Sequence, residues 1–67
     1  MTASELTRTR EVDEFGNVTF TVRSGERVVG RLVKMSAGSY RPERADLSYG
    51  PSGSIKHGLA WLAEYAA

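Results

Sequence analysis

The stretch VTFTVR, residues 18–23, decides the fold class, because apolar and polar side chains alternate along it without interruption. On an extended strand this alternation places Val18, Phe20 and Val22 on one face and Thr19, Thr21 and Arg23 on the other. β-Branched and aromatic residues also favour strands. The stretch therefore predicts a half-buried β-strand, and the segments on either side can be placed relative to it.

On the N-terminal side, residues 6–12 (LTRTREV) alternate as well and are rich in Thr and Arg. Charged side chains protect the free edge of a sheet, so this segment is predicted to be an edge strand. The intervening DEFGN is typical of a hairpin with a three-residue loop, residues 14–16, and a left-handed Gly16. This register predicts that Val12 lies opposite Val18 and Arg10 opposite Phe20.

On the C-terminal side, a turn at residues 24–26 leads into a third predicted strand, residues 27–35. Two registers are possible for this strand against residues 18–23. A two-residue turn with Gly25 first would place Val22 opposite Val29, whereas a three-residue loop would place Val22 opposite Val28. We favour the second register because it lays Phe20 over the bare backbone of Gly30. A slip of one residue would move every side chain to the other face.

The remainder predicts a loop, a short strand and a helix. Residues 36–42 (SAGSYRP) are expected to form a loop that exposes Tyr40 and Arg41, and residues 45–49 a fourth strand. GPSGS predicts a turn, and Ser54 can serve as the N-cap of a helix over residues 55–66. The helix has one apolar face with a spacing of about 3.6 residues: Ile55, Leu59, Leu62, Ala63 and Ala66.

These elements predict an α+β fold, a small antiparallel meander of three to four strands packed against one C-terminal helix. Residues 1–67 are expected to form a single domain, with residues 1–5 frayed. A chain of 67 residues buries only about 60% of its unfolded surface, and its core supplies about 3–5 kcal/mol of net stability. Little stability is left to maintain a deep, strained active site.

Composition excludes several classes of function. The chain has no cysteine, which excludes disulfides, thiolate nucleophiles and cysteine-ligated zinc. Its net charge of +1 is unlike that of proteins that bind nucleic acid through bulk charge. The opening MTASELT lacks the apolar run of a signal peptide, and no window is apolar enough to span a membrane. The cytosol is the expected compartment.

Two motifs are candidates for a catalytic or ligand-binding role. GPSGSIK contains two glycines and a lysine, but Pro51 removes a backbone donor and the spacing differs from that of a phosphate-binding loop. His57, the single histidine, has no nucleophile, orienting group or further metal ligand at a compatible spacing. We therefore interpret the loop as a turn with a serine cap and expect no enzymatic activity, no metal and no cofactor.

The flank of the predicted helix is more informative. Trp61 and Tyr65 lie four residues apart, so their side chains are neighbours beside the apolar face. Gly58 lies on the same flank, where a glycine costs about 1 kcal/mol relative to alanine and indicates close approach of another backbone. Trp61 either covers the edge of the small core or anchors a partner, since Trp, Tyr and Arg dominate interface hot spots.

Arginines are the other candidate contacts, because Arg8, Arg10, Arg23, Arg27 and Arg31 come from three adjacent predicted strands. A meander closed by a helix carrying AWLAEY resembles the DNA-binding modules of the AP2 and phage-integrase arm-binding type. That resemblance implies a three-stranded sheet in the major groove of duplex DNA, with one helix behind it. The base and phosphate contacts would then come from Arg8, Arg23, Arg27 and Arg31.

The chain also resembles small phage-encoded anti-CRISPR proteins in Ser54, Ile55, Lys56, Trp61 and Leu62. This resemblance implies a non-enzymatic phage or mobile-element protein that sterically inhibits a host protein or ribonucleoprotein complex. It is our leading hypothesis, and sequence-specific DNA binding is the alternative. The candidate partner-binding residues are Trp61, Tyr65, Gly58, Tyr40, Arg41, Arg44, Arg23, Arg27 and Arg31.

Overall fold

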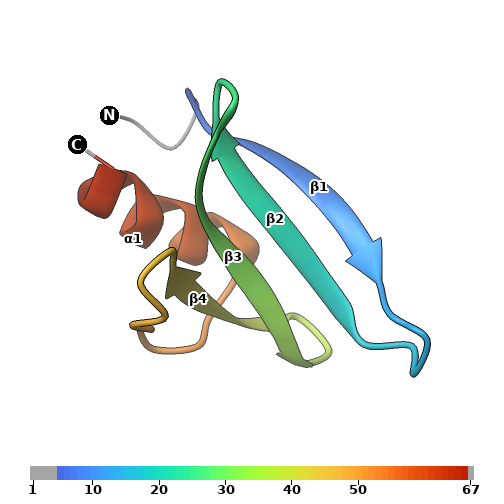
Figure 1. Cartoon of the computed structure of the whole chain (residues 1–67). Helices are drawn as coiled ribbons and strands as arrows, with labels where there is room; N and C mark the ends of the chain where they lie inside the picture. Colours follow the sequence, from blue (N-terminus) through green and yellow to red (C-terminus); the bar gives the residue numbers. More distant parts are fainter. Residues whose placement is uncertain (1–4, 67) are drawn as a thin grey trace.

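The computed structural model describes residues 5–66 and forms one four-stranded antiparallel sheet with a helix against one face (Figure 1). The strands follow chain order, β1-β2-β3-β4, and the chain ends in α1. Their bounds are β1 Thr7–Val12, β2 Val18–Ser24, β3 Arg27–Ser36, β4 Ser39–Arg44 and α1 Ile55–Ala66. The predicted α+β meander with a C-terminal helix is confirmed. Residues 1–5 were predicted to be frayed, and of these residues 1–4 lie outside the described part of the chain.

The first hairpin confirms the predicted register. Val12 pairs with Val18 and Arg10 with Phe20. Gly16 has a φ of 81°, and its N–H donates to the Asp13 carbonyl oxygen at 3.1 Å. The Asp13 carboxylate accepts from the backbone N–H groups of Phe15 and Asn17 at 2.8 and 2.9 Å, which closes the loop with a side chain.

The second hairpin matches neither predicted register along its whole length. Its turn is the two-residue one, because Ser24 pairs with Arg27. A bulge then follows, so that Val22 pairs with Gly30 instead of Val28 or Val29, and Phe20 pairs with Leu32. The favoured placement of Phe20 over Gly30 is therefore wrong. The extra residue turns Val29 into the core, where it is 1% exposed.

The fourth strand was misplaced in the sequence analysis. Residues 39–44 form β4 where a loop was predicted, and residues 45–49 form a turn where a strand was predicted. Pro42 is compatible with β4 because its backbone faces the outer edge of the sheet, where its carbonyl oxygen accepts from Gly50 N–H at 2.9 Å. Its missing N–H therefore costs no hydrogen bond to β3.

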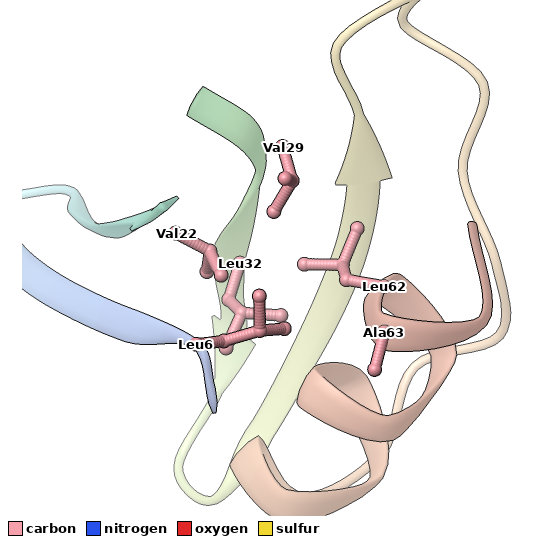
Figure 2. Close-up of a cluster of buried hydrophobic side chains, with 6 residues drawn as sticks. All are labelled: Leu6, Val22, Val29, Leu32, Leu62 and Ala63. Atoms are coloured by element: carbon pink, nitrogen blue, oxygen red, sulfur yellow. The ribbon is translucent and has the colours of Figure 1, made fainter. Parts of the chain in front are cut away.

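The core lies between α1 and the sheet (Figure 2). It consists of Leu6, Val22, Val29, Leu32, Leu62 and Ala63. The predicted helix face packs here through Ile55, Leu59, Leu62 and Ala63, and the side chain of Ala66 lies outside the described part. Ser54 is the N-cap as predicted, because its Oγ accepts from His57 N–H at 3.1 Å.

Two glycines allow the helix to lie close to β3 and β4. A Cβ on Gly30 would clash with the Glu43 carbonyl oxygen and lie 2.8 Å from Leu62 Cδ2. A Cβ on Gly58 would lie 2.6 Å from Leu32 Cδ2. Gly58 was expected to mark close approach of another backbone and to contact a partner. It is instead buried in the core, where it makes room for the Leu32 side chain.

Candidate functional site

The sheet has one face that α1 does not cover, which we call the open face. Alternation along the paired strands assigns side chains to it. The helix side carries the core residues Val22 and Leu32, and their neighbours along each strand point the opposite way. The open face comprises Thr7, Thr9, Glu11, Thr19, Thr21, Arg23, Val28, Arg31, Val33, Arg41 and Glu43.

Glu43, on the edge strand β4, is the buried charged residue of this face. Its side chain is 8% exposed and accepts from Arg31 Nε at 2.9 Å and from Arg41 Nη2 at 2.6 Å, one arginine on each carboxylate oxygen. Burial raises the pKa of Glu43, but the hydrogen bonds and charges of Arg41 and Arg31 outweigh it and hold the pKa below its ordinary value. Two fixed guanidiniums around one carboxylate leave a net positive charge here.

Arg41 also reaches an aromatic ring beside β4. Its Cζ lies 4.8 Å from the ring centroid of Tyr49, and Tyr49 forms an isolated bridge with Glu43. Tyr49 is 65% exposed. A guanidinium held over the ring of an exposed tyrosine is an amphipathic surface of the kind that is enriched at protein interfaces.

Leu47 has the most unusual backbone in the described chain. It is the one non-glycine residue there with a positive φ, 74°, and its side chain is 71% exposed. Its N–H donates to the Arg44 carbonyl oxygen at 2.9 Å, and Arg44 N–H donates to the Ser48 carbonyl oxygen at 2.7 Å. Gly16, Asp13 and Asn17 repeat this pattern in the first hairpin, both bonds at 3.1 Å. Leu47 therefore occupies a position where the first loop has glycine.

The left-handed conformation is costly for leucine, about 1–2 kcal/mol per residue. The exposed side chain recovers little of that cost by burial within the chain. Asp46 supports the turn, because its carboxylate accepts from the Ser48 hydroxyl at 2.6 Å and the Ser48 N–H at 3.0 Å. These bonds lower the pKa of Asp46. Thus the turn is well held, and the leucine at its tip is not explained by packing.

Leu47 and Val28 line the same hollow on this side, together with Thr21, Gly30, Arg31, Arg44 and Ala45. We call Val28, Leu47, Tyr49, Arg31 and Arg41 the Leu47 patch. A second hollow, lined mainly by residues of β1, β2 and the first loop, shares Thr21 and Arg31 with it. Each has a volume of about 210 Å³, below the roughly 300–1,000 Å³ of small-molecule sites. Hollows of this volume suit a protruding side chain better than a bound metabolite.

The helix flank has an explanation within the chain. Trp61 is half-buried against the core, and a Cβ on Gly50 would lie 2.5 Å from its Cε2. The Arg44 Cζ lies 4.1 Å from the Trp61 ring centroid and 4.9 Å from that of Tyr65, which is 40% exposed. Trp61 thus covers the edge of the core, one of the two roles left open for it.

The candidate arginines do not share one face. Arg23 and Arg31 lie on the open face, whereas Arg8 pairs with Val22 and lies on the helix side, 5.8 Å from the Phe20 ring centroid. Alternation places Arg27 on the helix side as well. The joint DNA contact expected from Arg8, Arg23, Arg27 and Arg31 is therefore split between two faces. Tyr40 packs edge-on against Phe20, with ring centroids 5.6 Å apart.

Four residues of this site were not predicted as contacts from the sequence: Val28, Leu47, Tyr49 and Glu43. Tyr49 and Leu47 were predicted to lie in a strand over residues 45–49, so the turn at Leu47 was not expected. The spacing of Asp46 and Ser48 was the available signal, because an Asp side chain commonly bonds the backbone two residues on. Within residues 5–66, no group of three or more His, Cys, Asp or Glu side chains could hold a metal ion.

Comparison with protein-family models, curated proteins and solved structures finds no match to this chain. No helix in the described part of the chain is long and apolar enough to cross a membrane.

Proposed function

We propose that this chain is a non-enzymatic binding domain that docks through the Leu47 patch onto a protein component of a host macromolecular complex and blocks it sterically. The observation that carries the proposal is Leu47, an exposed leucine with a left-handed backbone. An apolar side chain that is both costly and unburied within its own chain gains most from burial against another protein.

The surroundings of Leu47 support a protein partner over a small molecule. Exposed apolar side chains (Val28, Leu47, Tyr49) adjoin two arginines that are already positioned by Glu43. Pre-positioned arginines and aromatics lose little conformational entropy on binding, which is why such residues dominate hot spots. Steric inhibition fits a domain of 67 residues in which no catalytic constellation was recognised from the sequence.

Photo-crosslinking tests this assignment with a matched pair of aromatic positions. A photoreactive phenylalanine analogue replaces Tyr49 in one variant and Phe15, which is 81% exposed at the first hairpin tip, in the other. After irradiation in cells that make the protein, position 49 is expected to yield a discrete adduct with one protein and position 15 none. Equal adducts from both positions, or none from position 49, would contradict docking through the patch.

DNA binding is the second candidate, favoured by Thr9, Thr19, Thr21 and Arg23 on the open face. Hydroxyls and arginines are common phosphate contacts. Glu11 on the same face opposes it, because its carboxylate would approach the phosphates. Duplex DNA that binds at about 50 mM salt, with affinity falling steeply as salt rises, would favour this candidate over the protein partner.

A further inference from the structure

The two edges of the sheet differ in what covers them. The outer edge of β4 is occupied by residues 49–53, since Tyr40 N–H donates to the Gly53 carbonyl oxygen at 2.8 Å and Gly53 N–H returns a bond to Tyr40 at 3.0 Å. No residue among 5–66 pairs with the outer edge of β1, and all six residues of β1 are exposed. Within the described part of the chain, the outer edge of β1 is therefore unpaired along its whole length (Figure 1).

This edge is regular enough to accept another strand. β1 pairs with β2 from Thr7↔Arg23 to Val12↔Val18 without a register shift, and it contains neither proline nor glycine. Asp13 N–H donates to the Asn17 carbonyl oxygen, which marks a hydrogen-bonded pair at the end of the ladder. Alternation from that pair directs the backbone N–H and C=O groups of Arg8, Arg10 and Val12 to the open edge.

A second copy of the chain is a poor occupant. Two β1 strands joined edge to edge in one sheet are related by a two-fold axis perpendicular to it, so residues of equal parity face each other. The registers that pair most of the strand place Arg10 opposite either Arg8 or Arg10 of the second copy. Like charges directly opposite each other destabilise a strand pair.

Charge identifies a better occupant. Arg8 and Arg10 lie on the same side of the edge, and no carboxylate among residues 6–66 is within ion-pair distance of either guanidinium. Arg8 is held over the Phe20 ring, so its position is partly fixed. On the other side, Thr7 and Thr9 are neutral and Glu11 accepts from the Thr21 hydroxyl at 2.7 Å.

We propose that the β1 edge binds an extended acidic segment of another protein as an antiparallel fifth strand, with carboxylates opposite Arg8 and Arg10. Backbone bonds to Arg8, Arg10 and Val12 supply the pairing, and the two arginines select alternate acidic residues. This site is at the opposite edge of the sheet from β4 and is independent of the Leu47 patch. It adds a second interaction surface to the proposed function.

The test uses a hexapeptide that alternates Thr and Glu, titrated into the full-length, isotope-labelled protein and followed by amide NMR shifts. Shifts confined to β1 and its neighbours on β2 are expected. A peptide with Lys in place of Glu should not bind. Methylation of the Glu amides should abolish binding because those amides face β1, whereas methylation of the Thr amides should leave it intact.

Variants of the protein complete the design. Arg8→Glu with Arg10→Glu should reverse the preference to the Lys peptide, while Arg23→Glu on the open face should leave Glu-peptide binding unchanged. Leu47→Gly should also leave it unchanged, which separates this site from the proposed function. The proposal is overturned if both methylated peptides bind equally well, if no shifts occur, or if sedimentation shows a dimer with protected β1 amides.

Discussion

Leu47 and Gly16 occupy equivalent positions in two turns with the same backbone hydrogen bonds. Gly16 reaches its φ of 81° without a steric penalty, and Leu47 reaches 74° against one. Because the two turns have the same backbone hydrogen bonds, each is a control for the other. A change in stability on exchanging leucine and glycine at positions 47 and 16 therefore reflects the residue type and not the type of turn.

Leu47→Gly is predicted to stabilise the fold by about 0.5–1 kcal/mol, because the left-handed penalty of about 1–2 kcal/mol exceeds the chain entropy that glycine adds. The reciprocal change Gly16→Leu should destabilise by a similar amount. In thermal unfolding, each corresponds to a shift of a few degrees in Tm, about 4–8 °C per kcal/mol for a domain of this size. A lower Tm for Leu47→Gly would show that the leucine contributes to folding.

Glu43 makes stability depend on pH. Its folded-state pKa lies below the unfolded value of about 4.3, so the ionised carboxylate stabilises the fold above that value and this contribution disappears as pH falls through the folded-state pKa. Glu43→Gln should cost about 1–2 kcal/mol at pH 7, with the exposed arginines limiting the loss. Denaturant unfolding from pH 7 to 3 should show the gap between the two proteins narrowing below about pH 5. A gap independent of pH would contradict the role of the ion pairs.

At the scale of elements, sequence patterns were sufficient wherever local chemistry sets the structure. Strict alternation in residues 18–23, the left-handed Gly16 and the Ser54 cap each determine their own element, and all three were predicted. β4 was not, because Pro42 is compatible with a strand only when its backbone faces an outer edge, which depends on where β3 and residues 49–53 lie. The bulge at Val29 likewise depends on α1, since it brings Gly30 beneath Leu62.

Gly30→Ala is predicted to destabilise the domain by about 2 kcal/mol or more. The added methyl would meet the backbone of Glu43, which cannot rotate away, and the packed Leu62 side chain. Lys34→Ala, an exposed position on the same strand, is the matched control and should change stability by less than about 0.5 kcal/mol. Equal denaturation midpoints for the two variants would rule out the close packing of α1 on β3.

At the scale of the whole molecule, the free energy of unfolding is small, so the loss of one large packed side chain removes most of it. Trp61→Ala is predicted to leave the chain largely unfolded, because losing a packed tryptophan costs about 3–5 kcal/mol, comparable to the total for a domain of this size. Circular dichroism of the purified variant provides the measurement. A folded Trp61→Ala variant would return Trp61 to the role of a partner anchor.

The candidate site was harder to predict than the fold because its residues converge from separate elements. Arg31 and Arg41 come from two neighbouring strands onto Glu43, and Leu47 follows in a turn that the sequence analysis took for a strand. Arg41 was predicted as a contact because residues 36–42 were expected to form an exposed loop, whereas Arg41 lies in β4. The apolar part of the patch was missed, since exposure of Val28 and Leu47 depends on the open face having no described element against it.

The central claim is that Leu47 is retained for a partner and not for the fold. Its most direct test measures how much of the partner protein, once identified by crosslinking from position 49, each variant captures. The variants compared are wild type, Leu47→Gly and Met35→Gly, and Met35 is an exposed apolar control at the far end of β3. We predict that Leu47→Gly, although more stable, captures at least about tenfold less, a loss of 1.4 kcal/mol or more in binding, while Met35→Gly captures as wild type does. Undiminished capture by Leu47→Gly would contradict the claim.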